Sequence, residues 1–356
     1  MASLLQNCTD IEMHQELLSG QDYLLSEGVC CIFTIFASTL GILGNAVNIH
    51  VFLSIGLKDG LMFCLLLLSC FDLAYLVTVA WRYVSFVMFA VEKVSKYGFW
   101  FPVEPYGMYV FAGHVSRIPY TASILTTTLL AVLRCASVSM PIRFKYSFNA
   151  NFFKACVLTS AIFAFASCLP VLVLMGMVME YDSNVNSSRP VLWISPHREE
   201  VANIVWSLRD AFIPLATQAV VVVCVVVMSR YLRASATFRH INAGHPNIKT
   251  TTTANSQPGD QHTSTKLGGK ELQVLKQVVL ICVVYIACNT PTIFFNFTGL
   301  FVSGFTVQTS FNNVFLLTMG VKHVYQSFHA SVNFFIYYHY NSKFRHVFLK
   351  KYPIKI

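Results

Sequence analysis

The sequence predicts an all-α integral membrane protein, a bundle of seven transmembrane helices followed by a short C-terminal amphipathic helix. Of its 356 residues, 55% are hydrophobic and only 12% are charged, whereas soluble domains carry roughly 25% charged residues. Several stretches without Asp, Glu, Lys or Arg are longer than the roughly 20 residues that one helical crossing of a membrane needs. Together these observations predict a chain that folds in lipid.

Charge-poor stretches between polar segments predict the individual spans at residues 29–55, 61–89, 107–137, 152–179, 202–231, 272–302 and 312–339. The last two spans come from one uncharged run, from Gln277 to Val321, which is about twice as long as one crossing. Polar residues between Val302 and Asn313 divide this run. This division makes the count seven.

The positions of the basic residues predict an extracellular N-terminus and a cytoplasmic C-terminus. Most of the 25 Lys and Arg residues then fall in cytoplasmic loops or in the tail, as the positive-inside preference requires. The net charge of +9 is explained by anionic lipid of the inner leaflet and needs no nucleic acid. We therefore expect a multi-pass protein of the plasma membrane. Glycosylation sequons at Asn7 and Asn186 both fall on the predicted outer side.

The polar segments outside the spans divide the chain into an acidic extracellular tail at 1–28, a seven-span domain at 29–340 and a cytoplasmic tail at 341–356. A loop at about 234–270 is rich in Thr, Ser and Gly, so it is either a solvated linker or a phosphorylated regulatory loop. The tail alternates aromatic and basic residues, which is typical of an interfacial amphipathic helix. It contains no Cys, so a palmitoyl anchor is excluded.

The eleven cysteines show no spacing typical of a metal site. Most fall inside predicted spans, where a thiol acts as a small packing group. Cys8, Cys30 and Cys31 lie near the predicted outer side and could form a disulfide there. No catalytic residues, metal ligands or cofactor site are predicted, because no nucleophile with a base and no paired carboxylates occur at usable spacing.

Polar residues inside the spans are the candidates for function, because ionisable groups in lipid are costly. Asp72 lies deep in the second span, and Asn45, Ser123 and Asn333 lie at comparable depth in the first, third and seventh. These four residues could converge on one hydrated polar centre. The alternative is a purely structural polar pair.

An ordered set of motifs on these spans resembles the landmark residues of rhodopsin-like (class A) G-protein-coupled receptors. The set consists of Gly44-Asn45, the segment Leu68–Asp72, Leu133-Arg134-Cys135 followed by Met140-Pro141, the segment Asn333–Tyr337, and the prolines Pro170, Pro214 and Pro291. Each motif stands on the corresponding span and in the corresponding order over about 300 residues. The resemblance implies that Asp72, Asn45, Ser123 and Asn333 hold a sodium ion and water in the inactive state.

The resemblance also implies an activation switch at the inner end of the bundle. Arg134 would be the switch arginine, paired with Glu271, which stands twenty residues before Pro291. Asn289, two residues before Pro291, occupies the position of the family's tryptophan. Outward movement of the sixth span would break the pair and open a cavity, lined by Arg134 and Tyr337, for a heterotrimeric G protein.

Several positions depart from the family pattern and put coupling in doubt. Leu133 and Cys135 replace the acid and the aromatic residue beside the switch arginine, and Phe334 replaces the proline after the seventh-span asparagine. The loop from Glu180 to Glu200 contains no Cys, so the family's extracellular disulfide is excluded. These departures indicate a divergent branch of the family.

The outer half of the bundle predicts an anionic ligand. Ser116 stands where amine receptors have an aspartate, so an amine ligand is not expected. Ser327 stands where opsins have the lysine that binds retinal, so retinal is not expected either. Only one acid, Asp210, lies in this layer of the spans. Five basic residues lie there instead: Arg82, Arg117, Arg209, Lys322 and His323. Arginine forks suit carboxylates. The alternative is that these cations reach the headgroups or pair with loop acids Glu92, Glu104, Glu199 and Glu200.

The stretches 131–144 and 329–345 are most similar to invertebrate receptors, including gastropod chemosensory and neuropeptide receptors. The resemblance implies an extracellular small molecule or peptide, a G protein and membrane lipid as partners. The alternative function is that of a non-coupling seven-span protein, such as a transporter or channel, with Asp72 and His329 on an ion path. That function predicts symmetry-related broken helices, and the sequence contains no such repeat.

Overall fold

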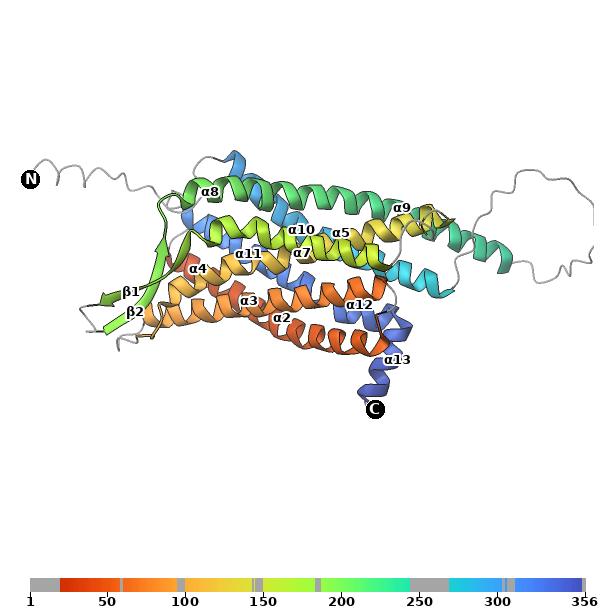
Figure 1. Cartoon of the computed structure of the whole chain (residues 1–356), viewed down its shortest axis with the longest axis horizontal. Helices are drawn as coiled ribbons and strands as arrows, with labels where there is room; N and C mark the ends of the chain where they lie inside the picture. Colours follow the sequence, from red (N-terminus) through yellow and green to blue (C-terminus); the bar gives the residue numbers. More distant parts are fainter. Residues whose placement is uncertain are drawn as a thin grey trace, which may run out of the picture.

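The computed structural model describes residues 20–57, 60–94, 100–142, 144, 150–182, 187–243, 269–302, 305 and 311–353. Within these ranges, long helices run side by side in one bundle (Figure 1). A two-stranded β-hairpin lies at one end of the bundle, and the last helix lies at the other. We call these the hairpin end and the tail end.

The elements follow one another as α2 (Gly20–Ile55), α3 (Gly60–Val94), α4 (Pro105–Val115), α5 (Arg117–Ser139), α7 (Ala150–Leu172), β1 (Met175–Asp182), β2 (Ser187–Ile194), α8 (Arg198–Val205), the π-helix η1 (Trp206–Phe212), α9 (Ile213–Ala243), α10 (Gly269–Phe301), α11 (Asn312–Ser331), α12 (Asn333–Tyr340) and α13 (Ser342–Lys351). Among the described residues, six helical segments are long and apolar enough to cross a membrane: Leu25–Ile55, Gly60–Val94, Pro105–Ser139, Asn151–Leu172, Glu200–Ala234 and Leu272–Gly299. These correspond to the first six predicted spans. The seventh prediction falls on α11 and α12, and α11 does not reach the same mean hydropathy because it carries Lys322, His323, Gln326 and His329.

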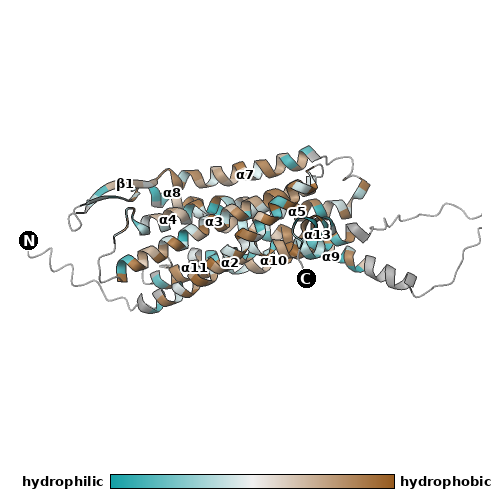
Figure 2. Ribbon diagram, turned by 90° about the horizontal axis from the view of Figure 1, so that it is seen from below, coloured by the Kyte–Doolittle hydropathy of each residue, from teal (hydrophilic) through white to brown (hydrophobic). Residues whose placement is uncertain are grey.

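Hydrophobic residues make up much of each long helix (Figure 2). Large hydrophobic side chains are exposed on several helices, among them Ile32 at 70%, Phe36 at 65%, Ile162 at 70% and Phe294 at 70%. In water an apolar surface of this extent would be strongly unfavourable, whereas lipid accepts it and helices satisfy their own backbone hydrogen bonds. The chain is therefore a multi-pass helical membrane protein.

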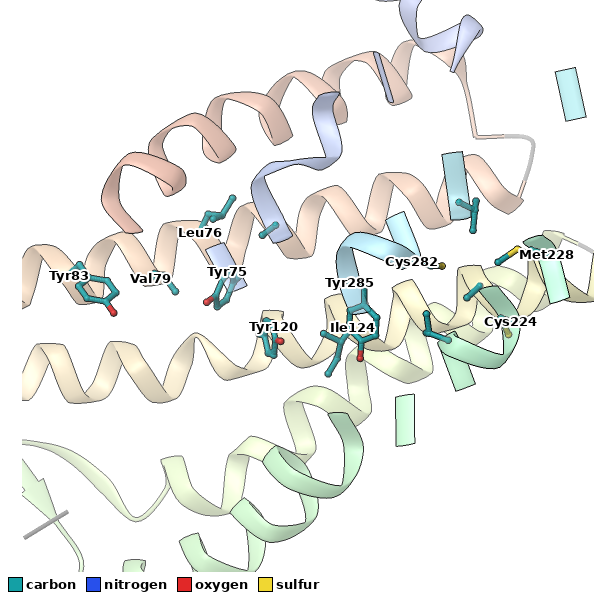
Figure 3. Packing of buried hydrophobic residues seen from close by; sticks show 14 of the residues in the cluster. Tyr75, Leu76, Val79, Tyr83, Tyr120, Ile124, Cys224, Met228, Cys282 and Tyr285 are labelled. Atoms are coloured by element: carbon teal, nitrogen blue, oxygen red, sulfur yellow. The ribbon is translucent and has the colours of Figure 1, made fainter. Parts of the chain in front are cut away.

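A core cluster of the bundle is formed by aromatic, aliphatic and thiol side chains from α2, α3, α5, α9, α10 and α11, and Figure 3 shows part of it. Tyr75 and Tyr83 of α3 face this core, and the ring of Tyr75 lies 5.3 Å from that of Tyr120 of α5. Cys224 of α9 and Cys282 of α10 pack in the same cluster. The ten cysteines in the described part of the chain are free, as expected of packing residues, and Cys8 lies outside it.

Two prolines explain why the spans at the hairpin end are not continuous α-helices. Pro119 cannot donate the amide hydrogen that Val115 would accept, and the third span is interrupted at Ser116, between α4 and α5. Pro214 likewise leaves the carbonyl of Asp210 without its helical donor, and η1 ends two residues earlier. The sequence predicted uninterrupted spans at 107–137 and 202–231. Both interruptions place charged residues, as described below.

The described residues are mostly helical, as predicted, but a β-hairpin stands where the sequence predicted the end of the fourth span. The expected fourth span ran to residue 179, but α7 ends at Leu172 and β1 and β2 follow as an antiparallel pair, with Met179 opposite Pro190. The apolar residues of β1 extend the apolar run of α7, and such a run does not by itself distinguish helix from strand. Pro190 is tolerated because each strand of a two-stranded sheet has a free edge.

Three helix boundaries also differ from the prediction. Helix α2 begins at Gly20, within the expected N-terminal tail, and this brings Glu27 into the bundle. Helix α9 continues to Ala243, so the polar loop expected from residue 234 begins later. The final span is divided at Val332, between α11 and α12, directly before Asn333. The predicted amphipathic tail helix is present as α13, and the Asn341 side chain caps it by accepting from the amide of Phe344 at 3.0 Å.

Candidate functional site

A buried carboxylate joins three helices in the middle of the bundle. Asp72 of α3 is 1% exposed. The hydroxyl of Ser123 in α5 donates to Asp72 Oδ1 at 2.6 Å, and Asn333 Nδ2 in α12 donates to Oδ2 at 2.7 Å. Hydrogen bonds to a charged group are the stronger kind, so this centre holds α3, α5 and α12 together.

Asn45, the fourth residue expected at this centre, lies beside it and contacts the backbone instead. Its Nδ2 donates to the carbonyl of Gly41 at 3.0 Å and to that of Ala330 at 2.8 Å. Asn48 donates to Asn45 Oδ1 at 3.3 Å. Ala330 stands two residues before the interruption at Val332, so Asn45 fixes α2 to the broken part of the last span. Within the described residues, the hydrogen bonds of Asn45 do not reach Asp72.

The donor set at Asp72 fits a sodium ion. Hard cations take oxygen ligands, and the Asp72 carboxylate and the Ser123 hydroxyl lie within 2.6 Å of each other. Each carboxylate oxygen accepts one of the hydrogen bonds above and retains a further lone pair. Asp72 and Ser123 would be the ligands that this chain supplies.

Asn289 forms a second polar junction, between α5, α9 and α10. Its side chain is 1% exposed. Asn289 Nδ2 lies within donating distance of Gln218 Oε1 at 2.9 Å and the Tyr285 hydroxyl at 3.2 Å, and Oδ1 accepts from the Tyr120 hydroxyl at 3.4 Å. Pro291 follows in the same helix, where it weakens the backbone ladder. The junction therefore fixes α10 at its least rigid point.

The tail end holds the residues predicted to form the activation switch. Tyr337 of α12 is fully buried between Phe52 and Phe344, with ring centroids 5.1 and 5.9 Å away. Arg134 of α5 is half-buried, and its carbonyl accepts from the Ser137 hydroxyl at 2.9 Å. The side chain of Glu271 lies outside the described residues, so its pairing with Arg134 stays a prediction.

At the hairpin end, two of the predicted cations pair with one acid. Asp210 in η1 accepts from Arg209 Nη2 at 2.7 Å and from Arg209 Nε at 3.2 Å. Arg117 Nη1, from the start of α5, approaches Asp210 Oδ1 at 3.5 Å. The Arg209 guanidinium also contacts Cys168 Sγ of α7 at 3.2 Å. The three charged side chains tie α5, α7 and η1 together.

Lys322 joins this group through Asn296. Lys322 in α11 is 1% exposed, and its Nζ donates to Asn296 Oδ1 in α10 at 3.1 Å. Asn296 Nδ2 in turn donates to the carbonyl of Asp210, the one that Pro214 leaves without a helical donor. A series of contacts therefore runs from α5 through η1 and α10 to α11. We call Arg82, Arg117, Arg209, Lys322 and His323 the cationic cluster.

Arg82 and His323 complete the cluster on the side of α3. Arg82 Nη2 donates to the Tyr109 hydroxyl at 2.7 Å, and its guanidinium lies 4.1 Å from the centre of that ring. His323 Nδ1 lies 3.4 Å from the Tyr83 hydroxyl, while His323 Nε2 has no hydrogen-bond partner in the described part of the chain. Glu27 is buried close enough to Arg82 for the two charges to interact.

The loop acids proposed as alternative partners of these cations have other roles. Glu92 accepts from Arg189 Nη2 of β2 at 2.9 Å, and Glu104 Oε2 accepts from the amide of Leu192 at 2.9 Å. Both contacts fasten the hairpin to the helices. The side chain of Glu199 lies outside the described residues, and Glu200 is exposed. A cavity of about 280 Å³, lined in part by Glu92 and Arg189, lies beside the hairpin.

The sequence did not identify Glu27, Asn296 and η1 as parts of the site. Glu27 lies two residues before the expected first span, and Asn296 is an uncharged residue inside the expected sixth span. Pro214 four residues after Asp210 was the available signal for η1. The sequons at Asn7 and Asn186 lie outside the described residues. No model of a known protein family matches this chain, and no curated protein matches it.

Proposed function

We propose that this chain is a rhodopsin-like G-protein-coupled receptor with seven transmembrane helices, an extracellular hairpin end and a cytoplasmic tail end. Helices α11 and α12 together form the seventh span, which packs against α2, α3 and α10. Its polar residues face the bundle, since Lys322, His323, Gln326 and Asn333 are all buried. A span whose polar side chains face inward does not need the hydropathy of an isolated helix.

The observation that carries the proposal is the buried hydrogen-bonded centre at Asp72. A carboxylate inside an apolar bundle is costly and marks a functional site by default. Ser123 and Asn333 bind Asp72 from two other helices, and these are the residues at which the motifs on separate spans resemble the receptor family. Structural support of a fold does not require a charge at this depth, because apolar packing serves equally well.

Separate polar junctions lie at several levels between the two ends of the proposed receptor. A ligand that binds the cationic cluster contacts α3, α5, η1 and α11 at the hairpin end. Asn289 and Pro291 lie in α10 between the hairpin end and the tail end, and Arg134 and Tyr337 lie at the tail end. We propose that ligand binding releases the junction at Asn289, that the tail end of α10 moves outward, and that the opened cavity receives a helix of the G protein. Sodium at Asp72 favours the closed bundle.

The ligand is an extracellular small anion of the chemosensory kind or a peptide. Buried or half-buried basic side chains outnumber the acids near them, since Arg82, Arg117, Arg209 and Lys322 face Glu27 and Asp210 among the described residues. A negatively charged ligand compensates this excess, because buried charge is costly without a partner.

A G-protein activation assay tests the receptor function. Cells that express the full chain or Arg134→Ala are exposed to amino acids, small carboxylates and amidated peptides, with surface protein quantified in each. We expect a response from the unmodified chain that Arg134→Ala abolishes. Arg230→Ala removes an exposed arginine of α9, which also lies toward the tail end of the bundle. This variant is the matched control and should respond normally. An equal response from both arginine variants would contradict the proposed switch.

A further inference from the structure

Asp210 stands in an unusual stretch of backbone. It lies in η1, a seven-residue π-helix, and a helix of this kind is rare and is frequently found at functional sites. Because Pro214 has no amide hydrogen, the Asp210 carbonyl is free to accept from Asn296. The backbone and the side chain of Asp210 thus contact two different helices, α10 and α5.

The two arginines do not hold Asp210 equally. Arg209 donates twice to the carboxylate, at 2.7 and 3.2 Å, whereas Arg117 approaches one oxygen at 3.5 Å, beyond good hydrogen-bonding distance. The Arg117 side chain is also 15% exposed, against 7% for Arg209. Arg117 is therefore the more weakly bound and the more accessible of the two guanidinium groups.

Buried donors beside Arg117 and Asp210 have unused bonding capacity. Lys322 carries three N–H donors, and within the described residues it makes one hydrogen bond and no ion pair. Gln326 lies one turn further along α11, on the same face. Gln326 Oε1 accepts from the Tyr75 hydroxyl at 3.1 Å, but Gln326 Nε2 has no partner among these residues. His323 Nε2 is also unpaired.

We propose that Arg117, Lys322 and the Gln326 amide bind the carboxylate of a small organic ligand, and that Asp210 is the internal competitor for Arg117. In the absence of ligand, Arg117 is attracted to Asp210, which connects α5 to η1. A ligand carboxylate takes over Arg117, and Asp210 stays with Arg209. The inference rests on the proposed function only for the downstream signal, since the binding step requires no G protein.

This exchange explains why Asp210 stands among Arg117, Arg209 and Lys322. A cluster of cations without any acid would repel itself in the empty site, whereas a fully neutralised cluster would leave no charge for a ligand. Asp210 pairs with the two arginines in the empty state, and the Lys322 amino group keeps further N–H donors for the carboxylate. Selectivity follows, because a neutral amide cannot compensate the Arg117 guanidinium once it leaves Asp210.

Thermal unfolding of the purified full chain in detergent tests the binding step directly, because a ligand that binds the folded state raises the midpoint. The probes are sodium acetate, sodium benzoate and sodium indole-3-acetate, with acetamide, benzamide and indole-3-acetamide as neutral controls. Sodium chloride keeps the ionic strength equal in all samples. We expect at least one carboxylate to raise the unfolding midpoint and its amide to have no effect.

Single substitutions then identify the groups that bind. Arg117→Gln and Lys322→Gln should each weaken carboxylate binding by about tenfold or more, since each removes a charge-assisted hydrogen bond. Asp210→Asn keeps the side-chain shape and removes the competing charge, so it should tighten binding by a similar factor. Arg198→Gln, which removes a cation that contacts His114 outside the cluster, should leave binding unchanged.

Three outcomes would overturn the inference: no stabilisation by any of the carboxylates, equal stabilisation by the amides, or unchanged or weaker binding in a folded Asp210→Asn variant. Asp210→Glu controls for folding, because it retains the charge and should bind more weakly than Asp210→Asn. A carboxylate-specific rise of the midpoint together with a silent G-protein assay would contradict the receptor function and leave the anion site in place.

Discussion

At the scale of single residues, Asp72 and Asn289 deep in the bundle are paired across helices, and each pairing makes a specific demand. Asp72 depends on two donors from different helices. Asn289 presents its amide to three helices, including its own. A buried polar group that loses its partner bears the cost of desolvation without compensation. Substitutions at these positions therefore separate residues that hold the bundle from residues that transmit a signal.

Asp72→Ala should lower the stability of the folded bundle. The change leaves the Ser123 hydroxyl and the Asn333 amide without their acceptor, and each unsatisfied buried group costs about 1–3 kcal/mol. Thermal unfolding in detergent measures the effect. Glu200→Ala, which truncates an exposed acid at the hairpin end, is the control and should unfold like the unmodified chain. An Asp72→Ala protein as stable as this control would mean that the centre carries no net stabilisation.

Asn289→Ala should raise signalling without ligand. The side chain joins α10 to Gln218 of α9 and to Tyr120 of α5, so its loss frees α10 beside Pro291. Basal G-protein activation, normalised to surface protein, is the measurement. Thr298→Ala removes a hydroxyl on α10 that bonds only to its own helix and should leave the basal signal unchanged. A lower basal signal in Asn289→Ala would show that the junction supports the active state instead.

The residue contacts also show what the sequence could predict. The convergence of Ser123 and Asn333 on Asp72 follows from comparable depth in the spans, because a buried charge requires partners nearby. The same rule predicted that Asn45 contacts Asp72, whereas Asn45 bonds to backbone carbonyls instead. Depth in the membrane does not determine the direction in which a side chain points. Asn296 was missed because an amide inside a span carries no charge and therefore gives little signal.

At the scale of elements, the tail helix α13 is held by aromatic packing and by polar contacts to α2. Phe344 is fully buried against Phe52, with ring centroids 5.3 Å apart. The Tyr352 hydroxyl lies 2.7 Å from His50 Nδ1, and Lys351 Nζ lies 3.0 Å from His50 Nε2. These contacts explain how the helix stays on the bundle although the sequence after the last span contains no cysteine for acylation.

Phe344→Ala should detach α13 from the bundle. Removing a fully buried phenylalanine side chain costs about 3–5 kcal/mol, and Phe344 packs on Phe52, Phe334 and Tyr337 of the bundle. Hydrogen exchange of the amides in 342–351 should become markedly faster. Leu349→Ala, at a position 42% exposed, should leave exchange nearly unchanged. Equal exchange rates in both variants would mean that lipid, and not Phe344, holds the helix.

The positions of the long elements were predictable, and their interruptions were not. Hydrophobic length places a helix in a membrane because lipid selects for it, and six predicted spans agree with apolar helices of the structure. The breaks at Ser116 and Val332 and the hairpin after α7 depend on local backbone bonding and on contacts between distant segments. Only Pro119 and Pro214 signalled such breaks in the sequence.

At the scale of the whole molecule, charge and hydropathy divide the bundle into an apolar outer surface and a polar interior. The described spans expose hydrophobic side chains on their sides and bury Asp72, Arg209, Asp210 and Lys322 inside. Polar residues gather toward the two ends (Figure 2). This arrangement suits a protein that exchanges signals between two aqueous sides without opening a wide aqueous pathway.

The proposed topology predicts where sugars and antibodies gain access. Asn7 and Asn186 should be glycosylated, because both sequons lie on the proposed extracellular side. Enzymatic deglycosylation should increase gel mobility of the unmodified chain, and the double substitution Asn7→Gln with Asn186→Gln should remove the shift. A C-terminal epitope should be stained only after the cells are permeabilised. Staining of intact cells would reverse the topology.

The π-helix has a consequence for the orientation of everything that precedes it in the fifth span. Each residue of an α-helix turns the chain by about 100°, and a π-helical segment accommodates an extra residue that would otherwise change the angular register. Deleting one residue from Trp206–Phe212 would allow an ordinary α-helix to form while turning the preceding segment about the helix axis. Hydrophobic length and membrane insertion would be nearly unchanged, but Arg209 and Asp210 would no longer both face Arg117. The hydrophobic length of this span determines its position in the membrane, and its angular register determines the direction in which its charged side chains point.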